Sequence, residues 1–199
     1  MRNMALEIVK YGHPALRHKS TPVTEINSEL RKAIAEMFEL MYAAKGIGLA
    51  SNQVAIPRQF FILNLTGDAA EKDEEVVFIN PVILNRKSSC EGEEGCLSFP
   101  GLYGPVKRAG EVLIEAFDLD GNCFEMTLSA KEDDLAVRAV QHESDHLDGM
   151  LFIDRMTDRA RKERQVEIDQ FEQDFLARQA AGEIESMDVL KRKLATWPN

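Results

Sequence analysis

The sequence predicts an α+β fold in which antiparallel or mixed β-sheets pack around a buried helix, with further helices near the amino and carboxy ends. Apolar residues recur at three- and four-residue steps between Asn27 and Gly46 and again between Leu135 and His146, as in amphipathic helices. Between these segments the apolar runs are short and broken by Gly, Asp, Asn and Pro, as in strands. The 199 residues, 44% hydrophobic and 29% charged, have the composition of one compact domain.

The first half of the chain divides into an arm, a helix and strands. Residues 8–23 carry Gly12, Pro14 and Pro22 and keep no period, so we expect an extended arm lying over the body. The helix ends before Gly46, and its apolar stripe belongs to the core. We expect strands at 60–65, 76–79, 82–84, 111–118 and 123–128, the last two joined by a hairpin turn at Asp120-Gly121.

The second half of the chain is predicted to be helical. Ser129 followed by Glu132 fits a capping box, and an apolar face then leads to the segment 141–146, with Gly149 as the stop. After residue 154 charged helix formers dominate. A stripe formed by Ile168, Phe171 and Phe175 is expected to pack on the body.

Charge and cysteine usage exclude several classes of protein. The balance of 24 basic against 34 acidic residues gives a net charge of −10, which argues against DNA binding or an anionic membrane surface as the main function. No run approaches the ~18 apolar residues of a membrane span. Three cysteines are an odd number, and the start of the chain lacks the apolar run of a signal peptide, so we expect a reduced, cytoplasmic protein.

The segment Gln141-His142-Glu143-Ser144-Asp145-His146 predicts a metal site. Residues four apart lie on the same face of a helix, about 6 Å along its axis, so His142 and His146 can reach one ion. Glu143 lies beside them, where it can exchange a proton with a water molecule without binding the metal. This arrangement is typical of metal-dependent hydrolases, and the buried metal-binding helix becomes the centre of the predicted fold.

A third protein ligand is needed, and the sequence offers several. In one class of proteases a histidine occupies the position of Phe152, which cannot bind a metal. In another class a glutamate lies about twenty residues on, near Glu163 and Glu167, but both fall on the charged tail helix. Cys96 is the better candidate, because a thiolate is a strong ligand and the neighbouring glycine allows a tight turn. Cys90 and Cys123 we interpret as small buried hydrophobic residues.

Gly46 to Gln53 forms the third notable segment. It is a weak match to a phosphate loop, because it follows a helix and lacks the third glycine and the lysine. Its glycines allow the backbone to pass close to a ligand, and Gln53 offers an amide N–H to a polarised carbonyl oxygen.

Together these segments resemble a known family. Gly46-Ile47-Gly48-Leu49-Ala50-x-x-Gln53, Glu94-Gly95-Cys96-Leu97-Ser98 and Gln141-His142-Glu143-x-Asp145-His146, in this order, resemble the three signature motifs of peptide deformylase. The arm Gly12-x-Pro14-x-Leu16-Arg17 is similar to the amino-terminal pattern of that family, and the resemblance runs from about Ile8 to Phe152. It implies a catalytic domain at residues 1–156, with residues 157–199 as a helical extension of the same domain.

The resemblance also implies the site and its reaction. Cys96, His142 and His146 would bind one divalent ion, with Fe²⁺ as the family's metal and Zn²⁺, Ni²⁺ or Co²⁺ as substitutes. Glu143 would be the acid/base, and Gln53 with the backbone N–H of Leu97 would stabilise the oxyanion. The substrate would be an N-formylmethionyl peptide, which is converted to formate and a free amino terminus.

Other residues receive weaker expectations. Backbone at Ile47 and Gly48 is implied to line the substrate groove, and Arg108 to contact the substrate peptide. Asp145 is either a partner of the metal ligands or a surface charge, and both interpretations stay open. Ser51 and Asn52 replace the commoner Ala-Pro of the family, which bears on the local loop shape.

Two other functions stay open beside deformylation. One is a general metalloprotease, weakened because the third histidine is absent. The other is a catalytically silent relative that binds peptide termini, which loss of Glu143, Gln53 or a ligand would favour, and none is lost. A cluster of Arg159, Arg161, Lys162 and Arg164 suggests a transient ribosome contact, although a solvated helix face is the more common meaning of such a charge run.

Overall fold

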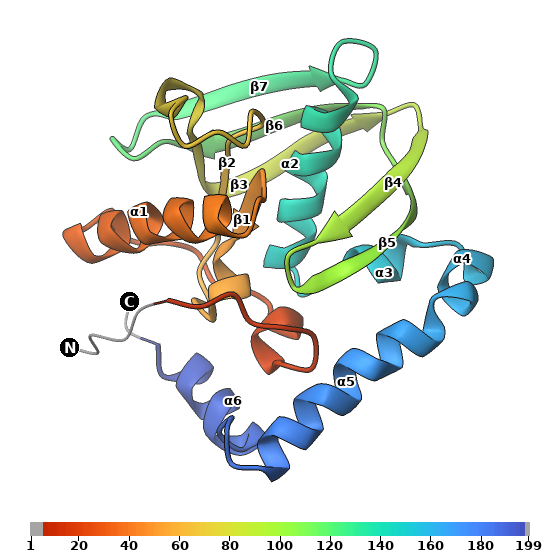
Figure 1. Ribbon diagram of the computed structural model, residues 1–199. Coiled ribbons are helices and arrows are strands. Elements are labelled where there is room, and N and C mark those ends of the chain that lie inside the picture. The colour runs from red at the N-terminus through yellow and green to blue at the C-terminus, as the bar shows by residue number, and fades with distance from the viewer. Residues whose placement is uncertain (1–5, 198–199) are drawn as a thin grey trace.

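The computed structural model describes residues 6–197 and places a central helix between two antiparallel β-sheets (Figure 1). The larger sheet has five strands in the order β1-β2-β3-β6-β7, and β4 and β5 form a separate hairpin. The elements in chain order are η1 Pro14–Arg17, α1 Ser28–Ala43, β1 Gly48–Ala50, η2 Ser51–Val54, β2 Phe60–Leu63, η3 Lys72–Glu74, β3 Val76–Lys87, β4 Cys90–Cys96, β5 Phe99–Arg108, β6 Glu111–Phe117, β7 Cys123–Ser129, α2 Asp134–Leu147, α3 Phe152–Arg155, α4 Asp158–Glu163, α5 Gln165–Ala180 and α6 Met187–Ala195.

Helix α2 is the central helix, and the predicted α+β class is confirmed. It packs on β1, β2 and β7 of the larger sheet, and Figure 1 shows the β4–β5 hairpin on its other side. The predicted capping box is wrong in position. Ser129 closes a turn by accepting from the backbone N–H of Glu132, and Asp133 caps the helix by accepting from Ala136 N at 2.9 Å. Gly149, at φ +73°, follows the helix end as predicted.

Helix α1 confirms the amphipathic pattern. The Asn27 side chain accepts from Leu30 N at 2.9 Å and so caps its first turn. Its buried face meets the inner side chains of β1 and β2 in one apolar cluster. The buried helix residues are Ile34, Met37, Phe38 and Met41.

The observed strands differ from the predicted ones in two ways. Segments 76–79 and 82–84 belong to a single strand, β3, because the irregular pairing next to Asn80, at φ +51°, does not end the ladder. Strands β1, β4 and β5 were not predicted. The sequence Cys90-Glu91-Gly92-Glu93-Glu94-Gly95-Cys96 shows no apolar alternation, and it becomes a strand through its pairing with β5.

The arm and the carboxy-terminal helices pack against each other. A Cβ atom at Gly12, which has φ +101°, would lie 2.5 Å from the ring of Phe175, so α5 sits directly on the arm. Leu194 of α6 and Ile168 of α5 join Leu16 of the arm in one core cluster, so the predicted packing of the α5 stripe is confirmed. Within residues 6–197, none of the helices has the length and apolar character that crossing a bilayer requires.

Candidate metal centre

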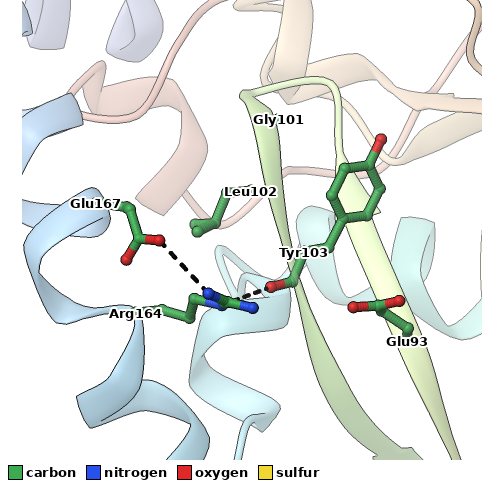
Figure 2. Close-up of a pocket in the computed structure, with 6 residues that line it drawn as sticks. All are labelled: Glu93, Gly101, Leu102, Tyr103, Arg164 and Glu167. Atoms are coloured by element: carbon green, nitrogen blue, oxygen red, sulfur yellow. Dashed lines mark hydrogen bonds and ion pairs between the residues drawn. The ribbon is translucent and has the colours of Figure 1, made fainter.

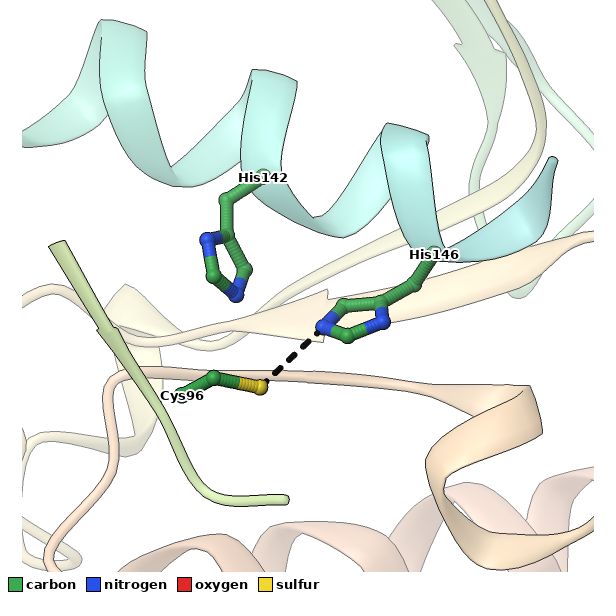
Figure 3. Close-up of side chains that lie close together, drawn as sticks. All are labelled: Cys96, His142 and His146. Carbon is green, nitrogen blue, oxygen red and sulfur yellow. Dashed lines mark hydrogen bonds between the residues drawn. The ribbon is translucent and has the colours of Figure 1, made fainter. Parts of the chain in front are cut away.

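Helix α2 and strand β4 bring the three predicted ligands to one point. Ligand atoms of Cys96, His142 and His146 all lie within 4.8 Å of one another (Figure 3). The Cys96 Sγ and His146 Nε2 atoms are 3.4 Å apart, and the two imidazole centroids are 4.9 Å apart. Cys96 ends β4, where the hairpin register shifts between Gly95 and Cys96 and turns the thiol toward the helix.

The donor set fits a divalent transition metal. The Nδ1 atom of His142 lies 3.0 Å from Glu94 Oε2, which leaves Nε2 as its metal-facing atom. His146 is buried, and burial lowers its pKa well below the ordinary value, so the ring is held neutral as a metal ligand must be. One thiolate and two imidazoles would leave a coordination position for water.

Glu143 lies in a buried position next to the ligands. A Cβ atom at Gly48 would come within 2.7 Å of Glu143 Oε1, so only glycine leaves room for this carboxyl group. Its Oε2 atom has no hydrogen-bond partner within residues 6–197. Burial raises the pKa of Glu143 to about 7, which suits a group that both takes and gives a proton near neutral pH.

The side chain of Gln53 has a fixed orientation. Its Oε1 atom accepts from Ala50 N at 2.9 Å, so its Nε2 atom points the other way, 3.3 Å from Cys96 Sγ and 3.2 Å from Ser98 Oγ. Gln53 therefore presents N–H groups at the thiol end of the site. Leu97 follows Cys96 directly, and its side chain fills the space against Gly46 that a Cβ atom would need.

The amino-terminal arm holds the two loops that carry Gln53 and Leu97. Val9 N donates to Gln53 O at 2.8 Å, and Tyr11 N donates to Ser98 O at 3.1 Å. Between them, Lys10 Nζ donates to Leu97 O at 2.8 Å. Three consecutive residues thus tie both loops to one extended segment.

Arg108 is placed differently from expectation. Its side chain is 3% exposed, and its Nε and Nη2 atoms each donate to Glu94 at 2.8 Å while Nη1 donates to Asp145. Burial opposes ionisation of Glu94, but the bonds from Arg108 and His142 outweigh it and lower its pKa to about 2. The geometry contradicts a substrate contact by Arg108, because its donors face buried carboxylates.

Asp145 belongs to the same buried network. It is 8% exposed and also accepts from Arg155, with Nη2 to Oδ1 at 2.7 Å. The surface-charge interpretation is therefore wrong. Asp145 reaches His142 through Arg108 and Glu94, a chain of contacts that sequence spacing did not reveal because Glu94 and Arg108 lie on the β4–β5 hairpin.

The remaining candidates lie elsewhere. Glu163 and Glu167 form ion pairs with Arg159 and Arg164 on the carboxy-terminal helices, away from the ligand cluster. Cys123 is exposed and Cys90 only partly buried, so the expectation that both are buried is wrong. They lie near the ends of β7 and β4, where one face of the strand is open.

A separate pocket of about 380 Å³ lies between the β4–β5 hairpin and the start of α5 (Figure 2). Arg164 spans it by donating from Nε to Tyr103 O at 3.1 Å and pairing with Glu167 at 3.5 Å. Glu93, Gly101 and Leu102 complete the lining. Neither the three metal ligands nor Glu143, Gln53 or Leu97 lines this pocket.

A thiol, two imidazoles and a buried carboxyl group around one point, on an α+β scaffold, define the class as metal-dependent hydrolases. The family model for polypeptide deformylase matches residues 5–162. A peptide deformylase of Rhodopirellula baltica is 40% identical over 98% of this chain and 94% of its own, and one of Acidobacterium capsulatum is 46% identical over 77% and 88%. A crystal structure of the Plasmodium falciparum peptide deformylase superposes with a TM-score of 0.81 at 37% identity, covering 86% of this chain and 98% of that one. The chain belongs to the polypeptide deformylase family.

Proposed function

We propose that this protein removes the formyl group from N-formylmethionyl nascent peptides, giving formate and a free amino terminus. The observation that carries the proposal is the convergence of Cys96, His142 and His146 with a buried carboxyl group, Glu143, beside them. Family membership supports the same reaction, because the relatives are named peptide deformylases.

Each residue has a defined part in the reaction. A divalent ion held by Cys96, His142 and His146 would acidify a water molecule and polarise the formyl carbonyl group. Glu143 takes the proton as the water oxygen bonds to the formyl carbon. Glu143 then gives this proton to the departing nitrogen as the carbon–nitrogen bond breaks.

The developing oxyanion needs hydrogen-bond donors that are already in place. The bond between Gln53 Oε1 and Ala50 N orients the Nε2 atom of the same side chain. The amide therefore needs little reorganisation before it donates to the oxyanion. The backbone N–H of Leu97 is the second donor in this proposal. The arm residues 9–11 hold both loops.

The substrate backbone is proposed to lie along Ile47 and Gly48. Strand β1 is at an edge of the five-stranded sheet, so one side of this segment is open to pair with an extended peptide. Because Arg108 is buried in the ion network, it acts on the site through Glu94 and has no contact with the peptide in this proposal.

Fe²⁺ is the proposed metal. A thiolate makes the site softer than an all-histidine site and compatible with Fe²⁺, and Zn²⁺, Ni²⁺ or Co²⁺ would occupy the same ligands. Metal analysis of protein purified without oxygen tests this assignment, and zinc as the only bound metal would contradict it.

The domain assignment and the cellular setting are also proposals. We propose a catalytic unit at residues 1–156 with residues 157–199 as an extension of the same domain, acting in the cytoplasm. A transient ribosome contact would use the basic residues of α4, of which Arg159 is 89% exposed in its side chain. Reversing the charge of Arg159 and Lys162 should weaken co-sedimentation with ribosomes at low salt, and unchanged co-sedimentation would rule the contact out.

A formate assay tests the function directly. Protein loaded anaerobically with Fe²⁺ or Ni²⁺ should release formate from formyl-Met-Ala-Ser, and metal-free protein should not. Cleavage of an internal peptide bond would support a metalloprotease instead. Binding of the peptide without any product would support a silent peptide-binding relative.

A further inference from the structure

Asn52 is a buried polar residue that the proposed reaction does not use. It lies in η2 between Ser51 and Gln53 and is 0% exposed. Its Nδ2 atom donates to the backbone carbonyl of His146, and its Oδ1 atom has no partner among the described residues. Burying a carboxamide that is only half satisfied costs free energy, so this position calls for a specific reason.

The bond joins two parts of the site that are distant in sequence. His146 is a proposed metal ligand in the last turn of α2, and Gln53, the proposed oxyanion donor, follows Asn52 directly. Asn52 and His146 are 94 residues apart in the chain. One side chain therefore links the loop of the oxyanion donor directly to the end of the ligand helix.

The bond is not required to satisfy the helix end. The carbonyl of His146 also accepts from Gly149 N at 2.9 Å, as expected where a glycine terminates a helix. The amide of Asn52 thus adds a second donor to a carbonyl that already has one. Its effect is on position, because it fixes where η2 sits against α2.

We propose that Asn52 is a positioning residue that holds the Gln53 amide at a set distance from the metal ligand His146. The inference rests on the proposed function, since it concerns the same oxyanion. A displaced donor weakens binding of the transition state more than binding of the ground state, so kcat falls while KM changes little. The bond also restrains the backbone of a ligand, so the metal should be lost more readily without it.

The test compares Asn52→Ala with Ser51→Ala in the Co²⁺-loaded protein. Ser51 is also fully buried, and its Oγ atom donates to Arg58 O within the same loop, without reaching α2. The measurements are kcat and KM for formyl-Met-Ala-Ser, the rate of Co²⁺ loss to a chelator, and the thiolate-to-cobalt absorption band. Circular dichroism reports whether each variant is folded, and Asn52→Leu, of similar shape but without a donor, provides a second variant free of a cavity.

For Asn52→Ala and Asn52→Leu we expect kcat to fall about 5- to 30-fold, with KM within about 2-fold of the wild type. Co²⁺ loss should accelerate, and the cobalt band should shift. For Ser51→Ala, kcat, KM and the rate of Co²⁺ loss should stay within about 2-fold of the wild type, and the cobalt band should not shift.

Two results would overturn the inference. One is a folded Asn52 variant with unchanged kcat and metal loss. The other is equal impairment in Ser51→Ala, which would indicate a general packing role for the turn. If the wild type releases no formate while the Asn52 variants still lose Co²⁺ faster, the proposed function fails and the positioning of His146 stands.

Discussion

Replacing Arg108 by methionine should remove most of the stabilisation of the buried Glu94 carboxylate. Arg108 makes two bonds of 2.8 Å to Glu94, and the nearest remaining guanidinium, that of Arg138, is 3.5 Å away. The folded protein lowers the pKa of Glu94 from 4.5 to about 2. This difference corresponds to about 3 kcal/mol, which is present at pH values above 4.5 and is lost as the pH falls through 2.

We therefore expect Arg108→Met to lower the free energy of unfolding at pH 7 by about 3 kcal/mol, in line with the cost of breaking a buried ion pair. Urea unfolding of wild type and variant measures it. Arg159→Met, at an exposed position where the pair with Glu163 is open to solvent, is the matched control and should unfold like the wild type. A loss below about 1 kcal/mol for Arg108→Met would refute the reasoning, because it would mean that Glu94 does not depend on this partner.

Three further predictions concern single residues. Glu143→Ala should lower kcat at least about 100-fold while the metal content stays at one ion per chain, and retained turnover would exclude Glu143 as the base. Cys96→Ser should weaken metal binding, measured by chelator competition, and an unchanged affinity would disqualify the thiol as a ligand. Burial lowers the pKa of His13 to about 4, so between pH 7 and pH 5 the unfolded chain takes up a proton at this residue and the folded protein does not. Over this range the free energy of unfolding of the wild type should fall by about 2 kcal/mol more than that of His13→Asn. Urea unfolding measures these free energies, and an equal difference between wild type and His13→Asn at pH 7 and at pH 5 would contradict that explanation.

The sequence predicted the elements whose signal is local. Helix α1 and the stop at Gly149 were predicted because apolar spacing and a left-handed glycine act within a few residues. The start of α2 was predicted too early, because the sequence offers two capping residues close together. Ser129 closes a turn, and Asp133 caps the helix. Strand β4 was missed because a strand rich in Glu and Gly is stabilised by its partner and not by its own pattern.

The candidate site, too, was predicted where the signal is local and missed where it depends on residues far along the chain. The ligand positions followed from helix spacing and from the family resemblance, and these side chains do converge. The surroundings did not follow, because burial of a charge depends on partners far along the chain. Arg108 was expected to contact the substrate peptide, but its donors meet Glu94 and Asp145. Asn52 was expected to affect only the shape of its loop, but its amide donates to the end of α2.

The arm has a consequence for the time at which this protein acquires a working site. Val9, Lys10 and Tyr11 leave the ribosome early, but their partners at Gln53, Leu97 and Ser98 are synthesised later. The two histidines of α2 follow later still. In a growing chain the arm is therefore synthesised before the loops that it binds. The arm, both loops and the two histidines can therefore take their final positions together only after residue 146 of the 199 has been synthesised.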